Sequence, residues 1–152
     1  MNEILLALAL SMTKVPYALS EPAVSDVIAA TEDEPCLPLG SSETCIENTR
    51  RLVLVWMFRE SAFKVDAVGD GGNSIGAMQT NKFFLRGRKS SEVLTSRQVA
   101  IKVWLGWARF GIEKCSSLER GLGLLASGFC GGGRALVVRR CKEAGVSCSQ
   151  SK

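Results

Sequence analysis

The sequence contains no histidine in its 152 residues. Histidine is the usual base beside a serine or cysteine nucleophile and a common metal ligand, so its absence excludes Ser-His and Cys-His catalytic sites and histidine metal centres. Any acid and base chemistry has to come from carboxylates. The sequence also lacks a CxxC pair, so a structural zinc site is not expected. We predict neither a bound metal nor a cofactor.

Long apolar runs are also missing, and no stretch reaches the roughly 18 apolar residues that a membrane-spanning helix needs. A short apolar run lies within residues 1–20, but Glu3 stands where export signals normally carry Lys or Arg. Apolar residues at 4, 5, 8, 12 and 15 fit one face of a helix, which favours an amphipathic helix docked on the domain. We expect no transmembrane segment and no convincing signal peptide.

The composition is that of an ordinary globular protein, with 46% apolar and 22% charged residues. This length predicts one domain over residues 1–152, in which residues 1–35 supply an N-terminal helix and a connector. The formal net charge of +4 favours anionic partners such as cell-wall polymer, acidic lipid or nucleic acid, without choosing among them. Nothing else supports nucleic acid, which we do not expect as a partner.

Six cysteines are many for this length, and they stand at positions 36, 45, 115, 130, 141 and 148. An even count fits three disulfides formed in an oxidising compartment, and six cysteines allow 15 pairings. Buried free thiols are the alternative. Cys36 and Cys45 form a plausible pair because they flank a connector rich in proline and glycine.

The spacing of apolar residues predicts a mostly α (α+β) fold with a small irregular or β insertion. Residues 31–43 have the composition of a connector, and Thr44 with Glu47 has the spacing of a capping box that starts a helix over about 45–60. Four glycines then interrupt residues 64–80, where short extended pieces or a small hairpin are expected. Further helices are predicted at 97–113, 117–127 and 134–144.

Glu60 follows a run of apolar residues, 52–58, at the end of the predicted helix 45–60. Val53, Trp56, Met57 and Glu60 are spaced i, i+3, i+4 and i+7, so the carboxylate continues an apolar stripe and should emerge against nonpolar walls. Desolvation and the negative end of the helix dipole both disfavour the anion. Glu60 is therefore a candidate general acid, and the alternative is that it ends the helix in solvent beside Arg59.

Three motifs follow one another here: Glu60-Ser61, then Gly69-Asp70-Gly71-Gly72-Asn73, then Gly76-Ala77-Met78-Gln79. In this order and spacing they resemble the catalytic core of the lysozyme-like lytic transglycosylases and goose-type lysozymes. The resemblance implies a lysozyme-like helical domain, a general-acid role for Glu60, and peptidoglycan glycan strands as the substrate.

The same resemblance places residues 74–79 on the opposite wall of a sugar-binding groove. Gln79 is expected to hydrogen-bond an N-acetylated sugar, and Ser61 to steady the carboxylate or the acetamido group. Ser74, Gly76 and Met78 complete that wall. For Gln79 the alternative is an amide that orders the loop, and for Met78 it is packing.

Residues 124–128, Leu-Leu-Ala-Ser-Gly, resemble the superfamily's Ala-Tyr-Asn-Ala-Gly segment, and the resemblance places Ser127 at the substrate. Leu125 and Ala126 replace the Tyr and Asn, which puts the contacts of those two side chains in doubt.

The tryptophans and the final basic helix have simpler interpretations. Trp56 is expected in the core, and so are Trp104 and Trp107, with one of the latter two reaching the cleft. Arg139, Arg140 and Lys142 would suit an anionic wall polymer, although a solvated charged face is the commoner explanation for such a run.

We therefore predict a peptidoglycan-degrading enzyme that cleaves the β-1,4 bond between N-acetylmuramic acid and N-acetylglucosamine, acting as a lytic transglycosylase. One alternative is a goose-type hydrolytic lysozyme with Asp70 as the second carboxylate, although Asn81 replaces a further acid of that family. Another is a non-catalytic phage or wall-associated structural protein that retains the fold. The expected location is periplasmic, extracellular or virion-associated, with phage structural proteins as potential partners.

Overall fold

The computed structural model describes residues 2–12 and 17–149, and the described chain is mostly helical. A small antiparallel sheet and a short 3-10 turn lie between the third and fourth helices, which confirms the predicted α+β class with a β insertion after helix 45–60. The helices are α1 (Glu3–Ser11), α2 (Tyr17–Thr31), α3 (Cys45–Ser61), α4 (Ser90–Thr95), α5 (Arg97–Cys115), α6 (Leu118–Ser127) and α7 (Arg134–Ala144). The sheet comprises β1 (Val68–Gly69), β2 (Ser74–Ile75) and β3 (Thr80–Asn81), with η1 (Asp70–Gly72) between the first two strands.

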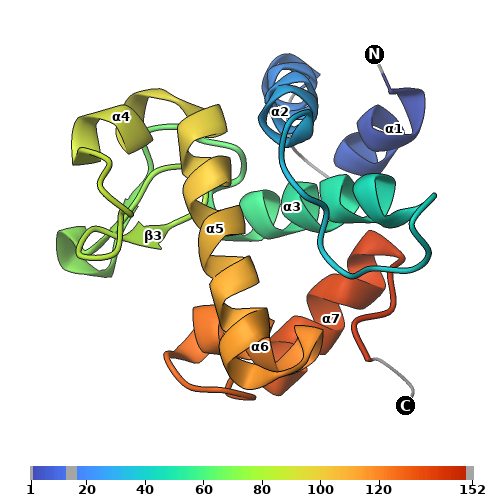
Figure 1. The fold of residues 1–152 in the computed structure, drawn as a ribbon. Coiled ribbons are helices and arrows are strands. Elements are labelled where there is room, and N and C mark those ends of the chain that lie inside the picture. Colours follow the sequence, from blue (N-terminus) through green and yellow to red (C-terminus); the bar gives the residue numbers. More distant parts are fainter. Residues whose placement is uncertain (1, 13–16, 150–152) are drawn as a thin grey trace.

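Helix α3 crosses the middle of the molecule, and the other elements are arranged around it (Figure 1). Helices α1 and α2 contact one side of α3, α7 contacts another, and α5 packs against α2, α4 and α6. The sheet and α4 lie beyond the C-terminal end of α3. Residues 52–57 of α3 are all buried, as expected for a helix surrounded by protein. The fold thus delivers the end of α3, and with it Glu60, to the junction between the helices and the sheet.

The N-terminal region differs from the single docked helix predicted from the sequence. It forms two helices, and the buried residues of α1 are Leu5 and Ala9, whereas Ile4 is 62% exposed. Val15, the last residue of the predicted stripe, lies outside the described residues. Asn2 starts α1, because its side-chain oxygen accepts hydrogen bonds from the N–H groups of residues 4 and 5. Helix α2 buries mainly small residues, which gave no clear helical stripe in the sequence.

The capping box predicted at the start of α3 is wrong. Thr44 has helical backbone angles and its side chain caps nothing, while the Glu47 carboxylate accepts a hydrogen bond from Asn2 Nδ2 at 2.9 Å. The reason is the turn that precedes the helix. The N–H groups of Thr44 and Cys45 both donate to the carbonyl of Ser41 (3.1 and 2.9 Å), so the preceding turn already leads the backbone into α3.

All six cysteines form disulfides, which excludes the alternative of buried free thiols. The bond between Cys36 and Cys45 confirms the predicted pair and ties the connector to the start of α3. Cys115 and Cys130 join the end of α5 to the loop after α6, and Cys141 and Cys148 join α7 to the segment that follows it. Disulfides of this number are typical of proteins in oxidising compartments.

The sheet is held close to α4 at Gly76. The strands pair in the order β1-β2-β3, with Val68 opposite Ile75 and Ser74 opposite Asn81. Gly76 has a φ of +74°, and a Cβ there would lie 2.6 Å from Val93 Cγ1 on α4. Only glycine satisfies both the backbone angle and the space.

Helix α4 was not predicted, and it begins with a side-chain cap. The Lys89 N–H donates to Glu92 Oε2 at 2.7 Å. This backbone hydrogen bond, with Arg88 nearby, holds the pKa of Glu92 below its ordinary value of 4.5. Within the described part of the chain, no helix has the length and apolar character required to cross a bilayer.

Candidate active site

A cleft of about 580 Å³ lies at the junction between the helices and the β insertion. Helices α3, α5 and α6 form one side of the cleft, and the segment around β3 forms the other. Most of its lining is apolar or aromatic, as in sites that bind organic ligands. The lining residues are Trp56, Glu60, Met78, Gln79, Thr80, Asn81, Phe84, Trp104, Trp107, Phe110, Lys114, Leu124, Leu125 and Gly128.

Glu60 lies in the last turn of α3 and provides the one carboxylate among these lining residues. Its side chain is 27% exposed, so it is half-buried but can be reached from the cleft. Glu60 therefore does not end the helix in open solvent, which was the alternative considered from the sequence. A lone, half-buried carboxylate in an apolar cleft is suited to proton transfer with a bound ligand.

Arg140 corrects the expectation of purely nonpolar walls around Glu60. Its Nη1 lies 2.6 Å from Glu60 Oε1, and its guanidinium carbon lies 4.3 Å from the centre of the Trp56 ring. The Arg140 side chain is only 6% exposed, so this residue does not belong to a solvated basic face either. A guanidinium at this distance forms a charge-assisted hydrogen bond to the carboxylate, so Glu60 has a fixed ionic partner beside the cleft.

A second ion pair lies beside the first and has the opposite polarity. Arg59 donates from Nε and Nη2 to the two carboxylate oxygens of Glu143, at 2.9 and 2.8 Å. Arg59 and Glu60 are neighbours on α3, while Arg140 and Glu143 are one turn apart on α7, where i and i+3 share a face. The two pairs therefore fix α7 against the end of α3 and fix the direction of the Glu60 side chain.

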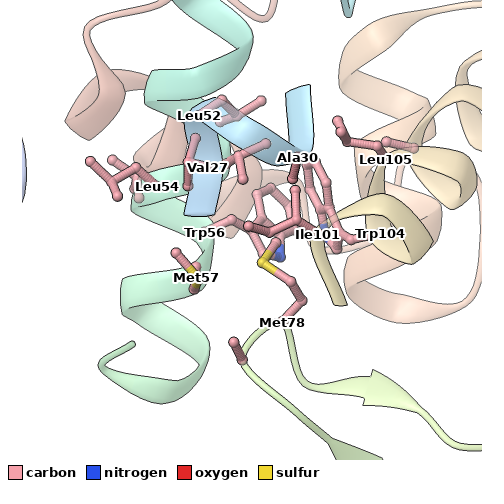
Figure 2. Packing of buried hydrophobic residues seen from close by; sticks show 14 of the residues in the cluster. Val27, Ala30, Leu52, Leu54, Trp56, Met57, Met78, Ile101, Trp104 and Leu105 are labelled. Carbon is pink, nitrogen blue, oxygen red and sulfur yellow. The ribbon is translucent and has the colours of Figure 1, made fainter. Parts of the chain in front are cut away.

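Trp56, Trp104 and Met78 form a buried wall of the cleft. The two indole rings are 5.1 Å apart and tilted by 52°, and each residue is at most 4% exposed, as expected for core tryptophans. Figure 2 shows Met78 reaching from the β insertion towards Trp56, Ile101 and Trp104. Met78 thus joins the insertion to the helical core while also lining the cleft.

An aromatic cluster forms the more exposed rim of the cleft. Trp107 is half-buried, while Phe84 and Phe110 are 54% and 40% exposed. Both phenylalanines meet Trp107 edge to face, with ring centres 5.5 and 5.3 Å away, and the Trp107 indole N–H donates to the carbonyl of Phe84. Lys114 stands beside Phe110. Phe84, Phe110 and Lys114 were not identified from the sequence as cleft residues.

Gln79 lines the cleft, but its amide nitrogen is used within the β insertion. Nε2 donates to the carbonyls of Ala67 (3.1 Å) and Gly76 (3.0 Å). Its backbone has a φ of +46°, in the left-handed region. These contacts correspond to the alternative in which Gln79 orders the loop.

The other predicted site residues lie outside the cleft lining. The hydroxyl of Ser61 donates to the carbonyl of Met57, and that of Ser127 donates to the carbonyl of Gly123, each within its own helix. Ser61 therefore does not steady the Glu60 carboxylate in this structure. Ser74 is buried and donates to the carboxylate of Asp70, and Gly76 faces α4.

Asp70 lies in the exposed turn between β1 and β2, with a φ of +50°. Its carboxylate accepts the Ser74 hydroxyl, and its carbonyl accepts the N–H of Asn73. These contacts are those of a residue that orders a turn. The structure therefore does not bring Asp70 into the cleft with Glu60.

Two further polar groups of the cleft residues were not identified from the sequence. Trp104 Nε1 and Thr80 Oγ1 are buried and have no hydrogen-bond partner within residues 2–12 and 17–149. Buried polar groups without a partner are rare, because each loses its hydration without compensation. Their place in the cleft wall is typical of a binding site.

Among the described residues, no group of three or more His, Cys, Asp or Glu side chains could hold a metal ion. Comparisons with protein-family models, with curated proteins and with solved structures found no match to this chain.

Proposed function

We propose that this protein cleaves the β-1,4 bond between N-acetylmuramic acid and N-acetylglucosamine in peptidoglycan, with Glu60 as the general acid and base. The observation that carries the proposal is the place of Glu60 as the one carboxylate of an aromatic-lined cleft, at the position given by the Glu60-Ser61 motif. Aromatic side chains on the rim suit the apolar faces of sugar rings. Among the residues that line the cleft, Lys114 is the one other charged side chain, and it lies beside Phe110 on the rim.

In the proposed reaction Glu60 first gives its proton to the glycosidic oxygen as the bond to the sugar C1 breaks. The ionised carboxylate then takes a proton from the group that attacks C1, which restores the acid. Arg140 stabilises the ionised carboxylate that exists between these two steps.

The place of Asp70 favours transglycosylation over hydrolysis. An inverting hydrolase needs two carboxyl groups about 6.5–9.5 Å apart on either side of a water molecule. Asp70 is instead bonded to Ser74 in an exposed turn outside the cleft. With one carboxylate, the attacking group is the muramic acid's own 6-hydroxyl, and the product is a 1,6-anhydro sugar.

The proposed site of action is the cell wall, reached from a periplasmic, extracellular or virion-associated location. Three disulfides support a location outside the reducing cytosol. The partners in this proposal are glycan strands, and phage structural proteins if the chain belongs to a virion.

A second candidate is a non-catalytic protein that binds glycan strands in the same cleft. The ion pair at 2.6 Å between Glu60 and Arg140 favours it, because one oxygen of the carboxylate already accepts a hydrogen bond from a buried guanidinium, as in a structural ion pair. This candidate predicts binding to peptidoglycan without any soluble product.

The test is mass spectrometry of the soluble products that purified peptidoglycan yields with the parent protein, with Glu60→Gln and with Asp70→Asn. We expect anhydromuropeptides from the parent and from Asp70→Asn, and a loss of at least about 100-fold with Glu60→Gln, because the amide cannot deliver a proton. Asp70→Asn is the matched control, since it also replaces a carboxylate by an amide.

Other results would decide against this mechanism. Reducing-end products alone, with Asp70→Asn as inactive as Glu60→Gln, would indicate a hydrolase that uses both acids. Peptidoglycan that binds the parent protein but releases no fragment would favour the non-catalytic candidate.

A further inference from the structure

The segment Lys82–Lys89, between β3 and α4, has an unusual composition. It reads KFFLRGRK, with four cationic residues, two phenylalanines and no acidic residue. All of its residues are exposed except Leu85. Exposed apolar side chains rimmed by polar or charged ones are typical of a surface that contacts a partner.

Part of this segment is anchored to the cleft rim. Leu85 is buried in the core, Phe84 packs edge to face on Trp107, and the guanidinium of Arg86 lies 5.7 Å from the centre of the same Trp107 ring. The backbone N–H of Phe84 donates to the carbonyl of Asn81. The segment therefore has a defined position. The contacts of its inner residues with the core and with the cleft rim explain why those residues are apolar, aromatic or basic.

The remaining side chains of the segment are exposed and form few contacts with other described residues. Phe83 is 74% exposed, the most exposed of the large hydrophobic residues in the described chain, and only Lys82 lies over its ring, at 5.5 Å. Lys82 and Lys89 are exposed, and neither forms an ion pair with a described residue. Arg88 forms one ion pair, in which its Nη1 lies 3.5 Å from Glu92 Oε1.

We propose that Lys82, Phe83, Arg88 and Lys89 form a docking surface for an anionic lipid bilayer. An apolar ring inserts at the boundary between headgroups and acyl chains, while flanking cations meet the negative surface charge. A soluble polyanion would satisfy the cations but would leave Phe83 in water. The apolar ring therefore favours the bilayer over a soluble polymer.

A second basic surface on α7 provides the comparison. Arg134, Arg139 and Lys142 surround Ala135 and the half-exposed Val138, but no aromatic side chain belongs to this surface. Arg134 is already paired with Glu119. The α7 surface thus has similar charge without an aromatic ring to insert, which makes it the matched control.

The experiment is co-sedimentation of the full chain with vesicles of phosphatidylcholine alone and of phosphatidylcholine mixed with phosphatidylglycerol. We expect binding to the mixed vesicles only, and weaker binding as salt is raised. The double variant Lys82→Ser/Lys89→Ser should lower the partition coefficient about 25-fold, since each cation contributes roughly fivefold. Phe83→Ser should lower it about tenfold through the lost apolar area, and Arg139→Ser/Lys142→Ser less than about threefold.

Three results would overturn the proposal. The first is equal binding to both kinds of vesicle. The second is an equal loss in the α7 variant, which would show that net charge alone is responsible. The third is full binding by Phe83→Ser alongside weak binding by Lys82→Ser/Lys89→Ser, which would identify a general polyanion surface. Circular dichroism establishes that each variant is folded, and all substituted side chains are exposed.

Discussion

Arg140 is the residue on which the interpretation of Glu60 depends. The sequence alone suggested an acid among apolar side chains, and it suggested that the basic residues of the last helix form a solvated face. In the structure a buried guanidinium lies between the Trp56 ring and the Glu60 carboxylate. The two residues are 80 positions apart in the chain, and no local pattern links them.

We predict that Arg140→Ala lowers the free energy of unfolding by about 2–4 kcal/mol, because it removes packing on Trp56 and leaves a half-buried carboxylate without its partner. Arg140→Lys should lose less, since it retains the charge but not the planar contact with the ring. Urea unfolding measures both.

Glu143→Gln is the control for this prediction, because it weakens the neighbouring but more exposed pair with Arg59. Its cost should stay below about 1 kcal/mol. If Arg140→Ala and Glu143→Gln lower the free energy of unfolding equally, burial does not increase the contribution of the Glu60–Arg140 pair to stability.

At the scale of elements, the long helices were predictable and the short ones were not. Helices α3, α5, α6 and α7 begin and end within about two residues of the predicted bounds, because apolar periodicity marks them and Gly128 and Gly145 end two of them. Helix α4 was missed because six residues with a polar sequence give no periodic signal. The division into α1 and α2 was missed because the apolar residues at 4, 5, 8, 12 and 15 keep one helical spacing past Ser11, where α1 ends.

The contact between β2 and α4 at Gly76 gives a prediction at this scale. Gly76→Ala should lower the free energy of unfolding by about 2–4 kcal/mol, because it combines a left-handed backbone with a clash against Val93. Gly71→Ala is the matched control, since Gly71 also has a positive φ (+62°) but no atom within 4 Å of an added Cβ.

Chemical unfolding measures both glycine variants, and Gly71→Ala should cost only about 1 kcal/mol from the backbone angle. If the two substitutions cost the same, the close approach of α4 to the sheet is not important for stability.

For the whole molecule, the sequence predicted the class of fold and the place of Glu60 at the end of a buried helix. It did not predict which side chains complete the cleft, because Phe84, Lys114 and Leu124 come from three segments that only the tertiary fold brings together. It also placed Ser61 and Ser127 at the substrate, where local hydrogen bonds to helix carbonyls instead occupy both hydroxyls. Motif spacing locates residues along the chain, but competition for hydrogen bonds decides what each side chain does.

The disulfides should differ in their effect on the cleft. Removal of either Cys36–Cys45 or Cys115–Cys130 by paired serine substitutions should lower the free energy of unfolding by about 2–4 kcal/mol. Only the second should also weaken the retention of the protein on insoluble peptidoglycan, because Cys115 follows Lys114 and Cys130 lies two residues after Gly128 in the cleft wall. Equal retention of the two variants would show that this crosslink does not shape the cleft.

The order of the crosslinks has a consequence for how the chain matures. Each cysteine is bonded to the next one along the sequence, at separations of 9, 15 and 7 residues. A chain that enters an oxidising space from its N-terminus therefore exposes each correct partner before the cysteines of the next pair arrive. Of the 15 possible pairings, this one alone can be completed in order of arrival with never more than one thiol waiting for its partner. Secretion from the N-terminus would thus select the native set of bonds with no need for an isomerase to exchange them.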